Sequence, residues 1–340
     1  QGWYDLLASE ARQTSYLAVA RGEVPRRHWR RLSRALVGQD HYCGMASWTG
    51  TMFEYFMPHL LLPAEQNSLL YESLAFCLYA QKKRVRGTGA PWGISESAFY
   101  AFDGAMNYQY KAHGVQALGL KWDLDSELVV SPYSTFLALL LAPHSALRNL
   151  RRLRDMGLEG RFGLYEAVDY TPSRLTGEGP YEVVRSYMSH HLGMSLVAID
   201  NTLNGPIMQR RFMADAAMAS YRELLQEKVP VGAQVLRAPR REVPEKPRRS
   251  AGPRFLREDG GGLRPEPTGM PPAVRWGLAG PVHRRGGVPL RDGRDRFDSV
   301  QPGAALAGAG RCPVSLRAGG ADAPDARALL SGGAGLRLAL

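Results

Sequence analysis

The 340-residue sequence has few cysteines and no long apolar run. Its three cysteines, Cys43, Cys77 and Cys312, form no CxxC or Cys/His metal spacing. They are too few and too scattered for a disulfide framework, which favours a reducing compartment. The longest apolar run, residues 136–143, is far short of the roughly 20 residues that a membrane span needs. We therefore expect no spanning helix, no metal site and no cofactor.

Motifs for nucleotide binding and for serine nucleophiles are also missing. The sequence contains no GxGxxG, no Walker loop and no nucleophile elbow. Dinucleotide, nucleotide and serine-hydrolase chemistry therefore lack the loops on which they usually depend.

The net charge of +11 belongs almost entirely to the C-terminal third. Residues 1–230 hold 24 Lys and Arg against 22 Asp and Glu, whereas residues 231–340 hold 19 against 10. A basic tail could attract nucleic acid. The balanced remainder argues against such a partner, and we expect none.

The tail changes in composition as well as in charge. Residues 231–250 read as a Pro/Arg-rich linker, and residues 251–340 contain no Lys, Ile, Asn or Tyr. The missing residues are encoded by AT-rich codons, which is typical of a GC-rich gene read in the wrong frame. A natural low-complexity, disordered tail explains the same composition. Under either interpretation we expect no folded function there.

Apolar residues return every three or four positions through most of residues 4–228, which predicts an all-α domain over residues 1–230. A short β-like stretch over residues 161–169 is the one strand that we expect. The expected helices cover residues 4–20, 25–37, 51–61, 64–84, 132–141, 145–156, 183–204 and 215–227.

The loops between these helices are rich in acidic and aromatic residues, which suits a sugar-binding cleft. Glycoside chemistry needs two carboxyl groups that flank the scissile bond, and sugar rings stack on Trp and Tyr. The candidate carboxylates are Asp5, Glu10, Glu54, Glu96, Glu166 and Asp169. The candidate sugar contacts include Trp48, Trp92, Tyr108, Tyr110, Tyr170, Arg12, Arg185, His190 and His191.

Each candidate has a structural alternative. Glu10 and Glu54 could be solvated or ion-paired helix residues, and Glu96 could satisfy backbone donors at a helix start. His190 and His191 are adjacent, so they point to different faces of a helix. One buried, hydrogen-bonded histidine and one exposed histidine fit this arrangement better than a metal site does.

Seven ordered stretches resemble the glycoamylase-like domain in the middle of cyclic β-1,2-glucan synthases, which is similar to endo-β-1,2-glucanases. The stretches are residues 4–12, 47–58, 91–98, 107–110, 165–174, 184–196 and 206–212. The resemblance implies an (α/α)6 barrel. It also implies that the chain is a fragment, incomplete at the N-terminal side of the barrel. The parent would be a larger bacterial synthase polypeptide with a glycosyltransferase and other domains, and this part would face the cytoplasmic side of the inner membrane.

The resemblance further implies residue roles. Glu10 matches the nucleophile and Glu96 the acid/base of a retaining transglycosylase that closes linear β-1,2-glucan into a ring. Tyr4, Asp5, Arg12, Trp92, Tyr108, Glu166 and Asp169 would line the glucan subsites. The alternatives are an inverting endo-β-1,2-glucanase, whose carboxyl groups would lie farther apart, and a truncated domain that only binds glucan or supports its neighbours.

Overall fold

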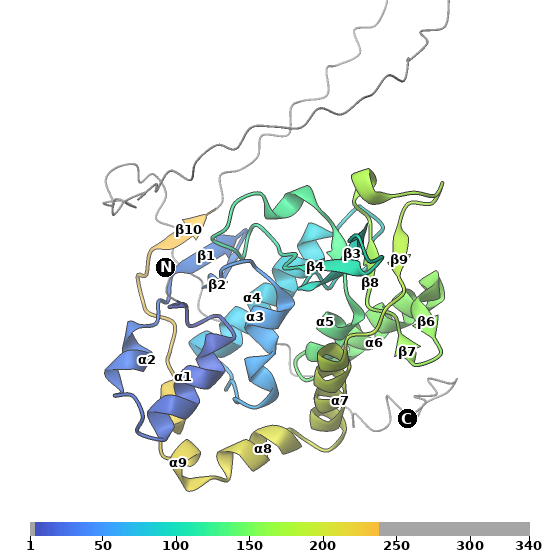
Figure 1. Ribbon diagram of the computed structural model, residues 1–340. Coiled ribbons are helices and arrows are strands. Elements are labelled where there is room, and N and C mark those ends of the chain that lie inside the picture. Colours follow the sequence, from blue (N-terminus) through green and yellow to red (C-terminus); the bar gives the residue numbers. More distant parts are fainter. Residues whose placement is uncertain (1–3, 238–340) are drawn as a thin grey trace, which may run out of the picture. The chain divides into compact units, whose positions relative to one another are not determined.

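A computed structural model describes residues 4–237 (Figure 1). Helices dominate this part of the chain. The α-helices are α1 (Ala11–Ala20), α2 (Arg27–Arg31), α3 (Met52–Phe56), α4 (Leu69–Arg84), α5 (Pro132–Leu137), α6 (Pro143–Leu153), α7 (Ser189–Leu203), α8 (Ile207–Met213) and α9 (Ala216–Ala219). Shorter turns of 3-10 helix are η1 (Pro58–Leu60), η2 (Leu124–Ser126), η4 (Pro172–Arg174) and η5 (Arg222–Leu225), and η3 (Arg154–Leu158) is a π-helical turn.

Several expected helices are shorter than the apolar pattern suggested. The first begins only at Ala11, because the segment before it is held to residue 33 by backbone bonds, with Leu7 N–H donating to the Ser33 carbonyl at 3.0 Å. The second divides into α2 and a strand, and the last divides into α9 and η5. Helix α8 was not expected.

Four small sheets were also not expected, and the prediction that residues 161–169 form the one strand was wrong. Within residues 4–237, the strand orders are β10-β1-β2, β3-β4, β5-β8-β9 and β6-β7. The strands are β1 (Leu36–Gln39), β2 (Tyr42–Met45), β3 (Ser97–Phe102), β4 (Tyr108–Lys111), β5 (Val129–Val130), β6 (Glu159–Gly160), β7 (Gly163–Leu164), β8 (Ala167–Asp169), β9 (Glu182–Val184) and β10 (Val235–Arg237). Strands of two to six residues leave little periodicity in a sequence.

The core forms around α4, which begins at Ser68, whose side chain accepts from the Tyr71 amide. Helix α4 packs against α3 and β2, where a Cβ on Gly44 would lie 2.9 Å from the Ser73 Cα. Only glycine permits this approach of strand to helix. Helix α5 packs against both α6 and α7, and the core continues through these helices. The regular elements therefore form a rigid base for the loops between them.

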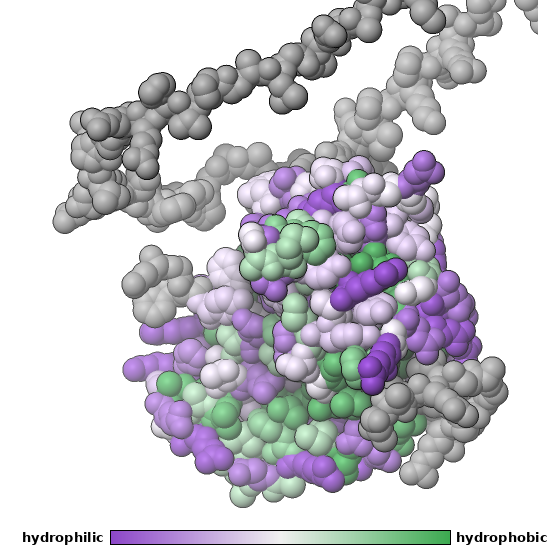
Figure 2. Space-filling model, turned by 45° about the vertical axis from the view of Figure 1, so that its right-hand side comes forward, coloured by the Kyte–Doolittle hydropathy of each residue, from purple (hydrophilic) through white to green (hydrophobic). Residues whose placement is uncertain are grey.

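Helix α7 carries apolar side chains that the core does not fully bury. Leu196 is 52% exposed, and Met194, Val197 and Ile199 are only partly buried. In Figure 2 apolar side chains gather in the lower half of the molecule, at the height where Figure 1 places α7 and α8.

The folded part reaches beyond the domain boundary that we expected at residue 230. Strand β10 pairs in parallel with β1, so residues 235–237 belong to the fold and not to a linker. The rest of the expected linker and the tail over residues 251–340 lie outside the described residues.

Candidate active site

Glu10 and Glu96, the two predicted catalytic carboxylates, lie within electrostatic reach of each other. Glu10 stands at the start of α1, and Glu96 directly precedes β3. Burial, together with the negative charges of Glu10 and Glu54, raises the pKa of the Glu96 carboxyl to about 7. The structure thus brings together two carboxyl groups that are 86 positions apart in the sequence.

The backbone that carries Glu96 is held firmly on its N-terminal side. The side chain of Gln81, on α4, accepts from the Ile94 amide at 2.7 Å and donates to the Ile94 carbonyl at 2.8 Å. Ser95 accepts from the Phe53 amide at 3.0 Å and shares a 2.7 Å hydrogen bond with Tyr133. Such supports fix a catalytic side chain more closely than a free loop would.

Tyr4 and Trp48 form an aromatic surface beside Glu10. Their ring centres are 6.3 Å apart, and Tyr4 is 53% exposed. Burial, together with the charges of Glu10 and Glu54, raises the pKa of the Tyr4 phenol. The Trp48 indole nitrogen has no hydrogen-bond partner. This surface suits stacking of a sugar ring next to the nucleophile candidate.

Glu54 has a structural role in place of the sugar contact that we expected. Its side chain is buried, and its two oxygens accept hydrogen bonds of 2.8–3.2 Å from the backbone and hydroxyl groups of residues 47–51. It also forms a capping box with Thr51 at the start of α3. These bonds leave little capacity for a sugar hydroxyl. Glu54 shapes the loop that presents Trp48.

Glycine is required where this loop meets the segment at residues 114–121. A Cβ on Gly50, whose φ is +69°, would lie 2.4 Å from the Val115 carbonyl oxygen. The Val115 amide donates to the Gly50 carbonyl at 3.2 Å. The two backbones therefore touch, and no larger residue fits at this position.

Glu166, His191 and Tyr110 form a hydrogen-bonded chain near Glu96. The buried His191 Nδ1 lies 2.9 and 3.0 Å from the two Glu166 oxygens, and its Nε2 lies 3.3 Å from the Tyr110 hydroxyl. Burial and the charges of Glu96, Glu166 and Glu10 raise the pKa of Tyr110. Tyr133 stacks on His191, and nothing in the sequence around Tyr133 pointed to it.

The burial predicted for the adjacent histidines is confirmed: His191 is buried and hydrogen-bonded, whereas His190 is exposed. Their expected separation on different faces of the helix is wrong, because their ring centres are 4.0 Å apart and both rings lie near Tyr110.

Two further predicted contacts are buried and occupied elsewhere. The Arg12 guanidinium donates to the Leu7 and Tyr55 carbonyls. The Trp92 ring belongs to the core, and its backbone is held by Asn149. These side chains support the site from within because they have no free surface for a sugar.

The fully buried Asp169 is likewise occupied, by an ion pair with Arg174 at 2.6 Å and by backbone amides. Tyr170 packs on Tyr181 and contacts the sulfur of Met156.

The remaining three predicted contacts stand on exposed or half-buried loops and hairpins. Asp5 is exposed, and its backbone carbonyl accepts a hydrogen bond from the Ser33 amide. Tyr108 packs on Phe102 at 4.6 Å between ring centres, and its hydroxyl accepts from the amide of the exposed Arg185. Their contact with substrate stays a prediction.

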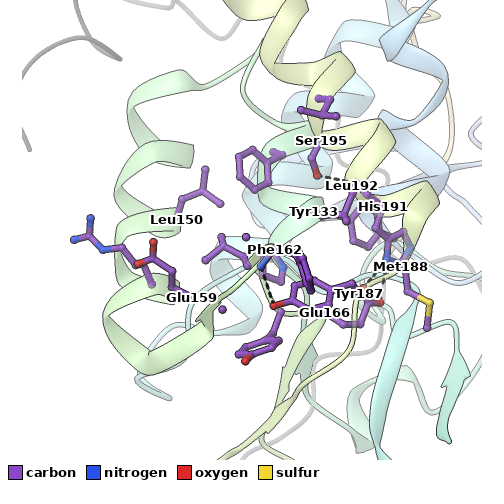
Figure 3. A pocket seen from close by; sticks show the side chains of 18 of the residues that line it. Tyr133, Leu150, Glu159, Phe162, Glu166, Tyr187, Met188, His191, Leu192 and Ser195 are labelled. Carbon is purple, nitrogen blue, oxygen red and sulfur yellow. Dashed lines mark hydrogen bonds and ion pairs between the residues drawn. The ribbon is translucent and has the colours of Figure 1, made fainter. Parts of the chain in front are cut away.

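A cavity of about 460 Å³ lies beside the carboxylate cluster and not within it. It shares Tyr133, Glu166 and His191 with the cluster, but neither Glu10 nor Glu96 lines it. Figure 3 shows its side chains converging from α5, α6, α7 and the β6–β7 hairpin. We expect the chemistry at Glu10 and Glu96, because the cavity is mostly apolar and, of its two acids, Glu159 is exposed and Glu166 is bonded to His191.

Two kinds of feature are absent from the described part of the chain. Residues 4–237 contain no group of three or more His, Cys, Asp or Glu side chains that could hold a metal ion. No helix in the same range is long and apolar enough to cross a membrane.

Comparisons with known proteins find relatives in carbohydrate metabolism. The family model "Glycoamylase: Putative glucoamylase" matches residues 3–216. The cyclic beta-(1,2)-glucan synthase NdvB of Rhizobium meliloti (strain 1021) is 43% identical over 237 residues, which cover 70% of this chain and 8% of that protein.

Solved structures give weaker similarity. A glucoamylase-like protein from Bacteroides caccae is 17% identical with a TM-score of 0.47, covering 62% of this chain and 52% of that one. An endo-beta-1,2-glucanase from Chitinophaga pinensis is 14% identical with a TM-score of 0.45, also covering 62% and 52%. Similarity at this level does not establish a shared fold.

Proposed function

The chain belongs to the glycoamylase family whose model matches residues 3–216, and from this membership we propose that it acts on β-1,2-glucan as a retaining transglycosylase. We infer the substrate from the cyclic β-1,2-glucan synthase, to which the chain is 43% identical. Because the chain spans only 8% of that relative, we propose that it works inside a larger synthase polypeptide. We also propose that its helices belong to an (α/α)6 barrel.

The observation that supports acid-catalysed cleavage of a glycosidic bond is the environment of one carboxyl group, Glu96. Burial, together with the negative charges of Glu10 and Glu54, raises the pKa of Glu96 to about 7, so it can hold a proton near neutral pH. Glu10 thus lies close enough to contribute to that shift. Pairs of acids whose environments separate their protonation states are typical of glycosidases.

In the proposed mechanism, the Glu10 carboxylate attacks the anomeric carbon while the Glu96 carboxyl protonates the departing glycosidic oxygen. The products of this step are a glucosyl ester on Glu10 and a shortened glucan. The Glu96 carboxylate then takes the proton from an incoming sugar hydroxyl, whose oxygen displaces Glu10. Two inversions at one carbon give net retention. Ring closure follows when that hydroxyl belongs to the same glucan chain.

The test starts with linear β-1,2-glucan. We expect Glu10→Gln and Glu96→Gln to abolish conversion, whereas Glu65→Gln, at an exposed ion pair with Arg222, retains it. NMR of the first products assigns the anomeric configuration. Inverted product would exclude the retaining mechanism, and unchanged conversion by either active-site variant would exclude that residue's role.

Azide gives a second test of the two roles. In Glu96→Ala, an aryl β-1,2-glucobioside with a good leaving group should still form the ester on Glu10. This ester should then accumulate, because no general base activates the incoming hydroxyl. Azide needs no general base, so it should restore turnover and yield a glycosyl azide of retained configuration. Absence of azide rescue in a folded Glu96→Ala would argue against Glu96 as the acid/base.

A further inference from the structure

His191, on α7, connects three neighbours of Glu96 through one imidazole ring. Its Nδ1 bonds to the Glu166 carboxylate, and its Nε2 lies 3.3 Å from the Tyr110 hydroxyl. The Tyr133 ring stacks on its face, with 3.6 Å between ring centres and 9° between the planes. His191 and Glu166 are 3% and 4% exposed, so both are too deeply buried to contact a sugar directly.

The partners of His191 determine which nitrogen carries the proton. A carboxylate only accepts, so Nδ1 must donate to Glu166. In the neutral imidazole Nε2 is then an acceptor, and the Tyr110 hydroxyl donates to it. The lone pairs of the Tyr110 oxygen are left free for another donor. Tyr110 is 41% exposed, and the charges of Glu96 and Glu10 reach its phenol.

The same assembly also holds the backbone on both sides of Glu96. Glu166 accepts from the Ala98 amide at 3.3 Å. Tyr133, stacked on His191, bonds to Ser95 at 2.7 Å. A change at Glu166 or His191 therefore reaches the acid/base candidate through bonded neighbours.

We infer that Glu166 and His191 are positioning residues, which orient the Tyr110 hydroxyl as an acceptor for a sugar hydroxyl beside Glu96. This inference rests on the proposed function for its substrate, and it replaces the expectation that Glu166 and His191 contact glucan themselves. The oriented phenol oxygen would accept from a neighbouring hydroxyl of the incoming sugar, which leaves the proton of the reacting hydroxyl free for Glu96. The chain Glu166, His191, Tyr110 thus acts on a substrate hydroxyl through hydrogen bonds alone.

A double-mutant cycle of Tyr110→Phe and Glu166→Gln tests the inference. The Glu166 carboxylate accepts from two donors, the His191 Nδ1 and the Ala98 amide. Glutamine has only one acceptor oxygen, so its NH2 group would face one of these two donors. We expect each variant to lower kcat on linear β-1,2-glucan about tenfold, with KM within about twofold, which is the size of one lost hydrogen bond in the transition state. The double variant should lose no more activity than the less active of the two single variants, because both changes remove the same contact.

Two results would overturn the inference: full activity in Tyr110→Phe, or losses that multiply in the double variant. Tyr110→Phe keeps the ring and its packing. Tyr79→Phe is the matched control, because its hydroxyl bonds to Asp40, between β1 and β2, and not to the cluster. If Glu166→Gln does not fold, His191→Gln takes its place in the cycle.

NMR of ¹⁵N-labelled histidine gives a reading that does not depend on turnover. We expect the His191 ring to carry its proton on Nδ1 in the unmodified protein and to change tautomer in Glu166→Gln, with a shift of Nε2 in Tyr110→Phe. A proton on Nε2 in the unmodified protein would overturn the inference. If the histidine spectra are as expected but the protein leaves β-1,2-glucan unchanged, the proposed function fails and the positioning of Tyr110 stands.

Discussion

Replacing Glu96 by glutamine should stabilise the protein at alkaline pH while it removes the proposed acid. The folded pKa of Glu96 is about 7, against 4.5 for the free side chain. Because the folded state holds this proton more tightly, the contribution of Glu96 to stability is fully present below about pH 4.5 and is lost as pH rises through about 7. Above that range the folded protein keeps an unfavourable charge that Gln lacks.

The size of the effect follows from the pKa difference. A pKa difference of about 2.5 corresponds to a free energy of about 3.4 kcal/mol. Glu96 keeps part of its contact with solvent, which screens the charge and reduces the expected gain to about 1–2 kcal/mol at pH 8. Near pH 4, where Glu96 is neutral in the folded protein, we expect almost no difference between the variant and the original protein.

Urea unfolding at pH 4, 6 and 8, followed by tryptophan fluorescence, measures this difference. Glu65→Gln is the control: hydrogen bonds from Gln226 and Arg222 lower the pKa of Glu65, so its replacement should give no gain at pH 8. A stability difference between Glu96→Gln and the original protein that does not change with pH would refute the reasoning, because burial beside Glu10 would then not disfavour the charge.

Three other predictions concern rate and stability. The kcat/KM on β-1,2-glucan should fall as pH rises through about 7, where Glu96 loses its proton; a pH-rate profile that stays level to pH 9 would contradict this. Glu54→Gln should cost about 3–5 kcal/mol in urea unfolding, because buried amides of residues 48–51 lose a charged acceptor; a loss below about 1 kcal/mol would be inconsistent with that role. Asn149→Ala should cost about 2–3 kcal/mol in the same assay, because it leaves the Trp92 backbone unpaired, and an unchanged midpoint would count against it.

Local signals in the sequence identified much of the helical framework. The apolar period placed the start of α3 within one residue, at the capping box of Thr51 and Glu54, whereas α4 begins only after its cap Ser68, inside the expected range 64–84. The period succeeds because an amphipathic turn is decided by residues three or four positions apart. Strands as short as β5 and β6 contain no such repeat, and β5 pairs with the distant β8.

The candidate site divides in the same way. Acidic residues among aromatic ones, together with the resemblance, were enough to select Glu10 and Glu96. Burial and partners then separated accessible candidates from enclosed ones: Glu54, Trp92 and Asp169 have the same chemistry as a sugar contact, but the fold encloses them.

Residue types and local spacing therefore determined which groups could do glycoside chemistry and where most helices start. Only the tertiary structure decided which of those groups share a space, because the raised pKa of Glu96 and the chain from Glu166 through His191 to Tyr110 depend on contacts between residues tens of positions apart. Desolvation and charge repulsion act over ångströms in space, and a linear sequence does not contain those distances.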